Sequence, residues 1–248
     1  MDIELADKNF YTAWMLNVDG FGAVLDRDQF CLTHWGAKDA VFNYAFVKTT
    51  VTDVDGFVDD IERFYGDRSY SYSLVSPQGR HTNIAQLADR LDLRRCDDVN
   101  GMLLSTPEYR AVSIIADLDI QAADTVEKIA DFQRVAANAY DMHEKVIAVV
   151  LNTTFMMHEN VFPFVGYIDS QPACTALVYF SDDMAGIYWV GTHGDFRCRG
   201  LGDAITWRVV EEAKRRNYST ITLQASAMGY PVYKKMGFVD MPYERYSL

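Results

Sequence analysis

Residues 186–216 restrict the fold more than any other segment of the sequence. Residues 186–190 are typical of a strand, a turn follows, and Gly200 and Gly202 open an amphipathic helix. Glycine permits positive φ angles and lets a ligand approach the main chain closely. The free N–H groups of a first helical turn, at the positive end of the helix dipole, favour an anion, most often phosphate. The segment therefore predicts a phosphate-binding loop between a strand and a helix.

Two other phosphate-binding motifs are excluded. A Walker loop has Lys and then Ser or Thr after its last glycine, whereas Asp203 and Ala204 follow Gly202 here. A dinucleotide-binding fingerprint needs a third glycine, where this chain has Ile205. It also needs an acidic residue about 20 residues later, yet the next predicted strand ends in Gln224.

Strand and helix patterns alternate along the whole chain. The predicted helices cover residues 5–16, 57–65, 84–91, 126–137, 143–151, 200–216 and 231–236. The predicted strands cover residues 41–51, 69–75, 111–115, 164–168, 175–180, 186–190 and 220–224, with a last strand near the C-terminus. This order predicts a mixed α/β protein, with helices packed on a mixed sheet. The polar, proline-containing stretch 105–108 predicts a boundary between domains at 1–107 and 108–248.

Composition excludes several classes of function. The net charge is −12, and Lys and Arg are not concentrated, so nucleic acid is not an expected partner, whereas a cationic small molecule or lysine-bearing peptide would be attracted. No apolar run approaches the roughly 18–20 residues that cross a bilayer, and the first residues lack the basic charge of a secretory signal. We therefore expect a cytoplasmic protein without membrane partners. The four cysteines and five histidines have no metal-ligand spacing, so no metal is expected.

Three motifs together resemble the GNAT superfamily of N-acetyltransferases. The sequence R-x-x-G-x-G at residues 197–202 resembles the pyrophosphate loop of that family, and residues 189–192 are similar to its strand that pairs with the pantetheine arm. The sequence Y-x-x-x-G-F at residues 233–238 resembles the closing motif of the family. Two positions depart from the pattern. Cys198 stands where relatives often have Gly, and Ser226 where many have Asn.

The resemblance implies a mixed, mostly antiparallel sheet flanked by helices, with acetyl-CoA as cosubstrate. It assigns Tyr233 as the catalytic acid that protonates the departing thiolate, with Tyr230, on nearly the same helical face, as the alternative. The general base is open, with Glu159, Asp182, Asp183 and Tyr188 as candidates. The oxyanion donor would be a backbone N–H near residues 190–191. The implied cofactor-binding residues are Val190, Gly191, Thr192, Arg197, Cys198, Arg199, Gly200, Leu201, Gly202, Asp203 and Ser226.

The first 107 residues have similar strand and helix content but no G-x-G loop. This resembles tandem members of the superfamily, whose first half keeps the fold and loses cofactor binding; the alternative is one acetyltransferase domain with an unrelated extension. The expected function is transfer of an acetyl group from acetyl-CoA to a primary amine, on a small molecule or a peptide, by direct attack in a ternary complex. An acetyl-CoA-binding regulator without turnover, and a structural protein with a vestigial loop, are the alternatives. The first half would supply a wall of the acceptor pocket or the surface of a homodimer.

Overall fold

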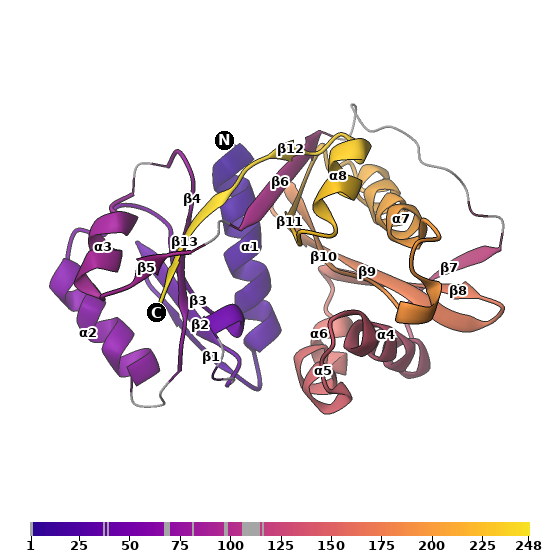
Figure 1. Cartoon of the computed structure of the whole chain (residues 1–248), viewed down its shortest axis with the longest axis horizontal. Coiled ribbons are helices and arrows are strands. Elements are labelled where there is room, and N and C mark those ends of the chain that lie inside the picture. Colours follow the sequence, from indigo (N-terminus) through magenta and orange to yellow (C-terminus); the bar gives the residue numbers. More distant parts are fainter. Residues whose placement is uncertain are drawn as a thin grey trace. The chain divides into compact units, whose positions relative to one another are not determined.

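The computed structural model describes residues 2–36, 38, 40–66, 70–80, 82–96, 99–105, 115 and 117–248. The chain forms two compact units (Figure 1). Unit 1 consists of Met1–Asn9 and Gly101–Asp240, and unit 2 consists of Phe10–Asn100 and Met241–Leu248. The predicted boundary at 107/108 lies outside the described residues and stays a prediction.

Unit 1 is built on a mixed sheet of seven strands in the order β12-β6-β11-β10-β9-β8-β7. Strands β7 to β10 are paired antiparallel in sequence order, whereas β10 and β11 are parallel. Parallel neighbours need a crossover connection, and α7 (Leu201–Arg215) provides it. The strands are β6 (Asn100–Ser105), β7 (Leu118–Ala122), β8 (Val161–Ile168), β9 (Gln171–Ser181), β10 (Met184–Thr192), β11 (Thr220–Ala225) and β12 (Val239–Asp240).

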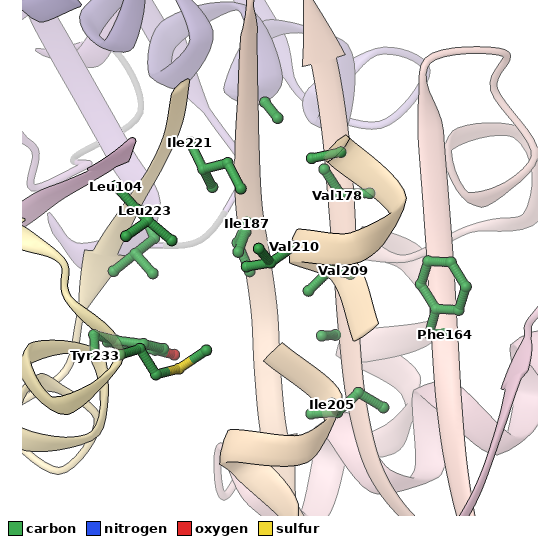
Figure 2. Packing of buried hydrophobic residues seen from close by; sticks show 14 of the residues in the cluster. Leu104, Phe164, Val178, Ile187, Ile205, Val209, Val210, Ile221, Leu223 and Tyr233 are labelled. Carbon is green, nitrogen blue, oxygen red and sulfur yellow. The ribbon is translucent and has the colours of Figure 1, made fainter. Parts of the chain in front are cut away.

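Helices cover both faces of this sheet. Helices α7 and α8 (Tyr230–Met236) lie on one face, and α4 (Val126–Ala139), α5 (Glu144–Val150) and α6 (Thr153–Met156) lie on the other (Figure 1). Burying one large apolar side chain stabilises a fold by about 1.5–3 kcal/mol, so the face of α7 that lies on the sheet fixes this helix firmly. Figure 2 shows that face, with Ile205, Val209 and Val210 of α7 against Val178, Ile187, Ile221 and Leu223 of the strands.

The first half of α1 (Asp2–Val18) belongs to unit 1 through Asn9, which is fully buried. The Asn9 side-chain amide donates to the carbonyl oxygens of Tyr179 (3.3 Å) and Met184 (3.2 Å), and its oxygen accepts from the Tyr188 hydroxyl (2.8 Å). A Cβ at Gly186 would lie 1.9 Å from that oxygen, so this contact requires glycine there. Burial raises the pKa of Tyr188 well above its usual value, so its hydroxyl stays protonated and acts as a donor.

Unit 2 contains a six-stranded mixed sheet in the order β1-β2-β3-β4-β13-β5. Strands β3 and β4 are parallel and are joined by α2 (Val54–Tyr65), as β10 and β11 are joined by α7. Helices α2 and α3 (Ile84–Arg90) pack on one face of the sheet, and the Phe10 ring of α1 contacts the Phe46 and Tyr243 rings. The strands are β1 (Ala23–Asp26), β2 (Phe30–His34), β3 (Asn43–Val47), β4 (Ser73–Pro77), β5 (Arg94–Arg95) and β13 (Tyr243–Ser247), and a short 3₁₀ helix, η1, covers Ala40–Phe42.

The structure confirms the mixed α/β class and every predicted helix, with ends shifted by a few residues. Asp53 is the N-cap of α2. The strands β1, β2, β5, β6 and β7 were not predicted, and the single strand predicted near the C-terminus is two short strands, β12 and β13. The four residues of β1 and the two of β5 are too short for a periodic signal, and β2 is buried along its whole length, so it lacks alternation. The strand predicted at residues 111–115 falls almost entirely outside the described residues.

Candidate functional site

A β-bulge interrupts β10 beside the crossover helix. The parallel pairing of β10 with β11 covers Ala185–Ile187 and Ile221–Leu223. Beyond it, the register of β10 against β9 shifts between Tyr188 and Gly191, so that two residues, Trp189 and Val190, stand opposite one residue of β9. Trp189 has a φ of 55°, in the left-handed region. A bulge re-aims the backbone of its strand, and here it does so where β10 no longer pairs with β11.

The first turn of α7 is open. Gly200 precedes the helix with a φ of 78°, which explains a glycine at this position, and within the described chain no side chain caps the helix. The Leu201 side chain is buried in the core, so only its backbone can face a ligand. A Cβ at Gly202 would have its nearest neighbour, Thr192 Oγ1, at 3.9 Å, so Gly202 leaves free space. Gly202 is helical, and its role is to leave space, which differs from the positive φ expected for both glycines.

The equivalent helix of unit 2 is closed in the same place. The Asp53 carboxylate accepts a hydrogen bond from the Gly56 N–H at 3.0 Å, at the N-terminus of α2. A Cβ at Gly56 would lie 2.4 Å from this carboxylate, so glycine makes room for the cap. A carboxylate at a helix N-terminus satisfies the N–H groups that would otherwise bind an anion. Only α7 of these two crossover helices therefore offers an unoccupied N-terminus.

The loop between β10 and α7 is tied to the C-terminal end of α4. The Gly194 N–H donates to Asn138 Oδ1 at 2.7 Å, and the Arg197 guanidinium donates to the Ala139 carbonyl at 3.3 Å and, less favourably, to the Thr192 carbonyl at 3.4 Å. The Arg197 side chain thus braces the loop in this structure, and its contribution to ligand binding would come chiefly from the main chain.

Cys198 occupies a strained position in this loop. Its φ is 60°, in the region that favours glycine, and its side chain is exposed. A residue with a Cβ costs roughly 1–2 kcal/mol in this conformation relative to glycine. Glycine, the residue that the resemblance implies at this position, would adopt this conformation without that cost. Arg199 follows, with its guanidinium 5.6 Å from the Phe196 ring centre, and Asp203 lies in the first turn of α7.

Tyr233 of α8 is buried and joined to α7. Its ring packs edge-on against Phe238, with the centroids 5.7 Å apart, and its hydroxyl hydrogen-bonds to the side chain of Thr206. The Thr206 hydroxyl donates to the Gly202 carbonyl at 2.7 Å. Burial raises the pKa of Tyr233, and the negative charge of Asp203 adds to this effect. Figure 2 shows Tyr233 beside the strand residues of the core.

Tyr230 lies one helical turn earlier and has a different partner. Its hydroxyl donates to Asp240 Oδ1 at 2.9 Å, and this bond to a carboxylate raises its pKa. Ser226 precedes α8, and its hydroxyl accepts from the Gly229 N–H at 3.1 Å. A Cβ at Gly229 would lie 2.9 Å from the Tyr233 ring and 3.4 Å from Ser226 Oγ, so Ser226 and Tyr233 meet at this glycine.

The candidates for a general base differ in their surroundings. The Asp182 carboxylate pairs with Lys8 at 2.6 Å, and the side chains of Asp183 and Glu159 are exposed. Tyr188 uses its hydroxyl as a donor to Asn9, as described above. Within the described ranges, no group of three or more His, Cys, Asp or Glu side chains gathers in a way that could hold a metal ion.

The structure therefore brings most of the predicted residues to one end of the β10–α7–β11–α8 arrangement. Val190, Gly191 and Thr192 lie at and after the bulge, and residues 197–203 form the loop and the first turn of α7. Three hydroxyl groups that donate to the backbone here were not predicted from the sequence, those of Tyr140, Thr175 and Thr206. Only Thr206 carried a signal, because it lies four residues after Gly202 and can bond back to it.

The arrangement combines an open helix N-terminus, a bulged strand and a buried tyrosine. Residues 116–235 match the family model described as an acetyltransferase (GNAT) domain. The chain thus contains a GNAT acetyltransferase domain, a family that uses acetyl-CoA, and the resemblance inferred from the motifs is confirmed.

Solved structures extend the likeness to both units. A GCN5-related N-acetyltransferase from Kribbella flavida has a TM-score of 0.74 and 13% identity, with 98% of this chain and 95% of that chain covered. A tandem GNAT protein from the clavulanic acid biosynthesis pathway has a TM-score of 0.65 and 12% identity, with 95% of this chain and 86% of that chain covered. A GCN5-related N-acetyltransferase from Sphaerobacter thermophilus has a TM-score of 0.64 and 13% identity, covering 92% and 75%. At these identities the likeness shows the fold, which is that of two GNAT-like halves. No curated protein matches this sequence. No helix in the described part of the chain is long and apolar enough to cross a bilayer.

Proposed function

We propose that this protein transfers an acetyl group from acetyl-CoA to a primary amine by direct attack in a ternary complex. The observation that carries the proposal is the link between the open N-terminus of α7 and Tyr233, through Thr206 and Gly202. Anion binding by the N-terminus of α7 alone would not require the buried Tyr233 hydroxyl near this helix. The pairing of an anion site with a proton donor is what acyl transfer from a phosphate-bearing thioester requires.

The cofactor-binding part of the proposal rests on space and on free backbone donors. The pyrophosphate would lie against the first turn of α7, where Gly202 leaves space and the N–H groups have no side-chain cap within the described residues. Val190, Gly191 and Thr192 would pair with the pantetheine arm along the outer end of β10. Arg197, Cys198 and Arg199 would line the same loop, and Asp203 and Ser226 its two sides.

The chemical steps then follow from the groups at hand. The amine nitrogen attacks the thioester carbonyl carbon, and the negative oxygen that forms is stabilised by a backbone N–H at the bulge, for which Val190 is our candidate. Collapse of this intermediate breaks the C–S bond, and the sulfur takes a proton from Tyr233. The amine loses its proton to solvent or to a base, and the products are an amide and the free thiol.

The amine class is supported by charge. The chain carries a net charge of −12, so a cationic acceptor is attracted to it. A panel of primary amines, from small polyamines to lysine peptides, should therefore be screened with acetyl-CoA in an assay of thiol release. Turnover with at least one amine, and none with the matching N-acetylated amine, is the expected result.

An acetyl-CoA-binding regulator without turnover is the second candidate function. Such a regulator would bind acetyl-CoA at the same open N-terminus of α7, but Tyr233 would have no catalytic role. Tight binding of acetyl-CoA in titration calorimetry, without thiol release by any amine of the panel, would support the regulator and contradict the enzyme.

A further inference from the structure

Two hydroxyl groups hold the backbone on either side of Val190. The Thr175 hydroxyl donates to the Trp189 carbonyl at 3.1 Å, and the Tyr140 hydroxyl donates to the Val190 carbonyl at 3.0 Å. Trp189 and Val190 are the two bulge residues of β10. Each of the two peptide groups that flank Val190 is therefore fixed by its own side chain, one from β9 and one from the end of α4.

Both hydroxyl groups act from the side of the sheet that α4 covers. A Cβ built on Gly191 would lie 2.8 Å from Ala139 Cβ, 3.3 Å from Thr175 Oγ1 and 3.5 Å from Tyr140 Cε2. Gly191 is thus the point where α4, β9 and β10 meet. The Tyr140 ring also packs edge-on against Trp189, with the centroids 5.1 Å apart.

The contact to the Trp189 carbonyl also fixes the direction of the Val190 N–H, because both belong to the same peptide group. A trans peptide is planar, and its C=O and N–H point in opposite directions. The hydroxyl that holds the Trp189 carbonyl therefore directs the Val190 N–H away from Thr175. Trp189 has a φ of 55°, which is strained for a bulky residue and persists only where surrounding contacts fix it. Thr175, which is fully buried, supplies such a contact.

We propose that Thr175 and Tyr140 are positioning residues of the acyl-transfer site, which hold the two peptide groups around Val190 in the orientation that the reaction uses. Thr175 sets the N–H that faces the developing oxyanion. Tyr140 fixes the Val190 carbonyl, which has a second lone pair for an amide N–H of the cosubstrate. The inference rests on the proposed function in taking the Val190 N–H as the oxyanion donor.

The surroundings of Tyr140 agree with this role. Its side chain is 44% exposed, so its ring is accessible to solvent. Its pKa is nevertheless raised, because the hydroxyl end is buried and, as a second cause, because a charge on Tyr233 would repel one on Tyr140.

Thr175→Val and Tyr140→Phe test the inference, since each substitution removes a hydroxyl and keeps most of the shape. We expect kcat to fall about 10- to 100-fold in each variant, which does not exceed the fall caused by complete removal of an oxyanion donor. The Kd for CoA should change less than threefold. Thr175→Ser keeps the hydroxyl and should restore most of the kcat. The matched controls are Thr222→Val, a buried threonine of β11 whose hydroxyl has no hydrogen-bond partner in the described chain, and Tyr167→Phe, whose hydroxyl bonds Asp131. Both controls should stay within twofold of the unmodified protein.

The outcomes separate this inference from the proposed function. If the unmodified protein acetylates an amine and both variants keep their kcat within twofold, the inference is wrong and the function stands. If no amine is acetylated, ¹⁵N relaxation of the Val190 and Gly191 amides decides. Their order parameters should be near the rigid value of about 0.85 in the unmodified protein and clearly lower in each variant. Unchanged order parameters would overturn the inference without any activity measurement. Should Thr175→Val fail to fold, Tyr140→Phe still supplies both readouts, because that ring is half exposed.

Discussion

Tyr233 of α8 and Thr206 of α7 are joined through their hydroxyl groups. The Thr206 hydroxyl also donates to the Gly202 carbonyl at 2.7 Å, so Thr206 connects Tyr233 with the first turn of α7. The candidate acid and the proposed cofactor loop are therefore connected through Thr206, and we expect a change in one to affect the other.

Removal of the Tyr233 hydroxyl should affect turnover far more than binding. Tyr233→Phe keeps the ring and its packing against Phe238, and it deletes only the proton donor. General acid catalysis typically contributes about 10²–10⁴-fold, so we expect a fall in kcat of that order, with the Kd for acetyl-CoA within threefold. Steady-state kinetics and titration calorimetry measure the two quantities. The loss should be smaller with a thioester whose leaving thiol is more acidic, because that thiolate needs its proton less.

Tyr230→Phe is the matched control for this experiment. The Tyr230 hydroxyl bonds Asp240, so its removal should leave kcat within about twofold. A large loss in Tyr230→Phe with a normal Tyr233→Phe would transfer the acid role to Tyr230. Normal kcat in both would mean that water protonates the thiolate.

The dependence of kcat on pH should lack an alkaline limb below about pH 10. The ordinary pKa of tyrosine is about 10, and burial raises that of Tyr233, so the hydroxyl stays protonated and competent as an acid throughout the range below 10. The rate should rise with pH as the acceptor amine loses its proton. Measurement of kcat from pH 6 to 10 checks this, and a descending limb centred near pH 8 would contradict Tyr233 as the acid.

Gly202→Asp should abolish most of the cofactor affinity and leave the fold intact. The added carboxylate would occupy the space beside the first turn of α7 and repel the pyrophosphate, so we expect the Kd for acetyl-CoA to rise about 100-fold or more. A Cβ at Gly202 has no neighbour closer than 3.9 Å, and an acidic residue suits a helix N-terminus, so the Tm should change by less than about 3 °C. Gly202→Ala, which adds volume without charge, should show a smaller loss. Unchanged affinity in Gly202→Asp would remove this loop from the site.

One acetyl-CoA should bind per chain, in unit 1. In the described part of the chain, α2 and α7 are crossover helices in equivalent positions. The N-terminus of α2 is capped by Asp53, whereas α7 begins at Gly200 and has no side-chain cap there. Titration calorimetry should therefore give a stoichiometry near one, and Gly202→Asp should remove the single binding event. A value near two would show that unit 2 also binds the cosubstrate.

The sequence contained enough information to predict the strand, loop and helix of residues 186–216, and the reason is local. The strand, the two glycines and the amphipathic face of α7 are set by residues close together in the chain, and the structure has Gly200 in the left-handed conformation that only glycine adopts easily. The pairing of strands that lie far apart in the sequence was not predictable in this way. Strand β6, from the first 107 residues, pairs in the sheet of unit 1, and β13, from the chain's end, pairs with β4 and β5 of unit 2. Pairings of such high sequence separation leave no periodic mark.

The hydrogen bonds of Asn9, Thr175 and Tyr140 could not be predicted from the sequence for a similar reason. Asn9 binds residues near position 180, and Thr175 and Tyr140 bind the bulge of β10 from two other elements. An ordinary threonine or asparagine in a sequence is more often a surface or capping residue than a buried donor, so its role appears only when the fold brings its partner to it.

The end of α7 contains a buried carboxylate that should make unit 1 sensitive to acid. The Glu212 side chain is 5% exposed and pairs with Arg208 (3.3 Å), Arg215 and Arg216 (2.8 Å). The Arg216 guanidinium also lies 3.6 Å from the Phe162 ring centre, so the cluster fastens the helix to β8. Burial alone would raise the pKa of Glu212, but the hydrogen bonds from Arg215 and Arg216 outweigh it and hold the pKa at about 2.

Glu212→Gln should therefore destabilise the protein at neutral pH and lose this effect in acid. Because the folded-state pKa lies below the ordinary value of about 4.5, the stabilisation by Glu212 is complete above pH 4.5 and disappears as the pH falls toward 2. Solvent screens the pair, since the Arg215 side chain is 66% exposed, and we expect a loss of about 1–2 kcal/mol in the free energy of unfolding at pH 7. Urea unfolding at pH 7, 4 and 3 measures the difference between Glu212→Gln and the unmodified protein, which should shrink at each step. Glu211→Gln is the matched control, because its carboxylate is 36% exposed and pairs only with Lys214 in the described ion pairs, so it should change the free energy by less than about 0.5 kcal/mol at any of these pH values. A difference for Glu212→Gln that stays constant from pH 7 to pH 3 would contradict a lowered pKa and assign the loss to packing.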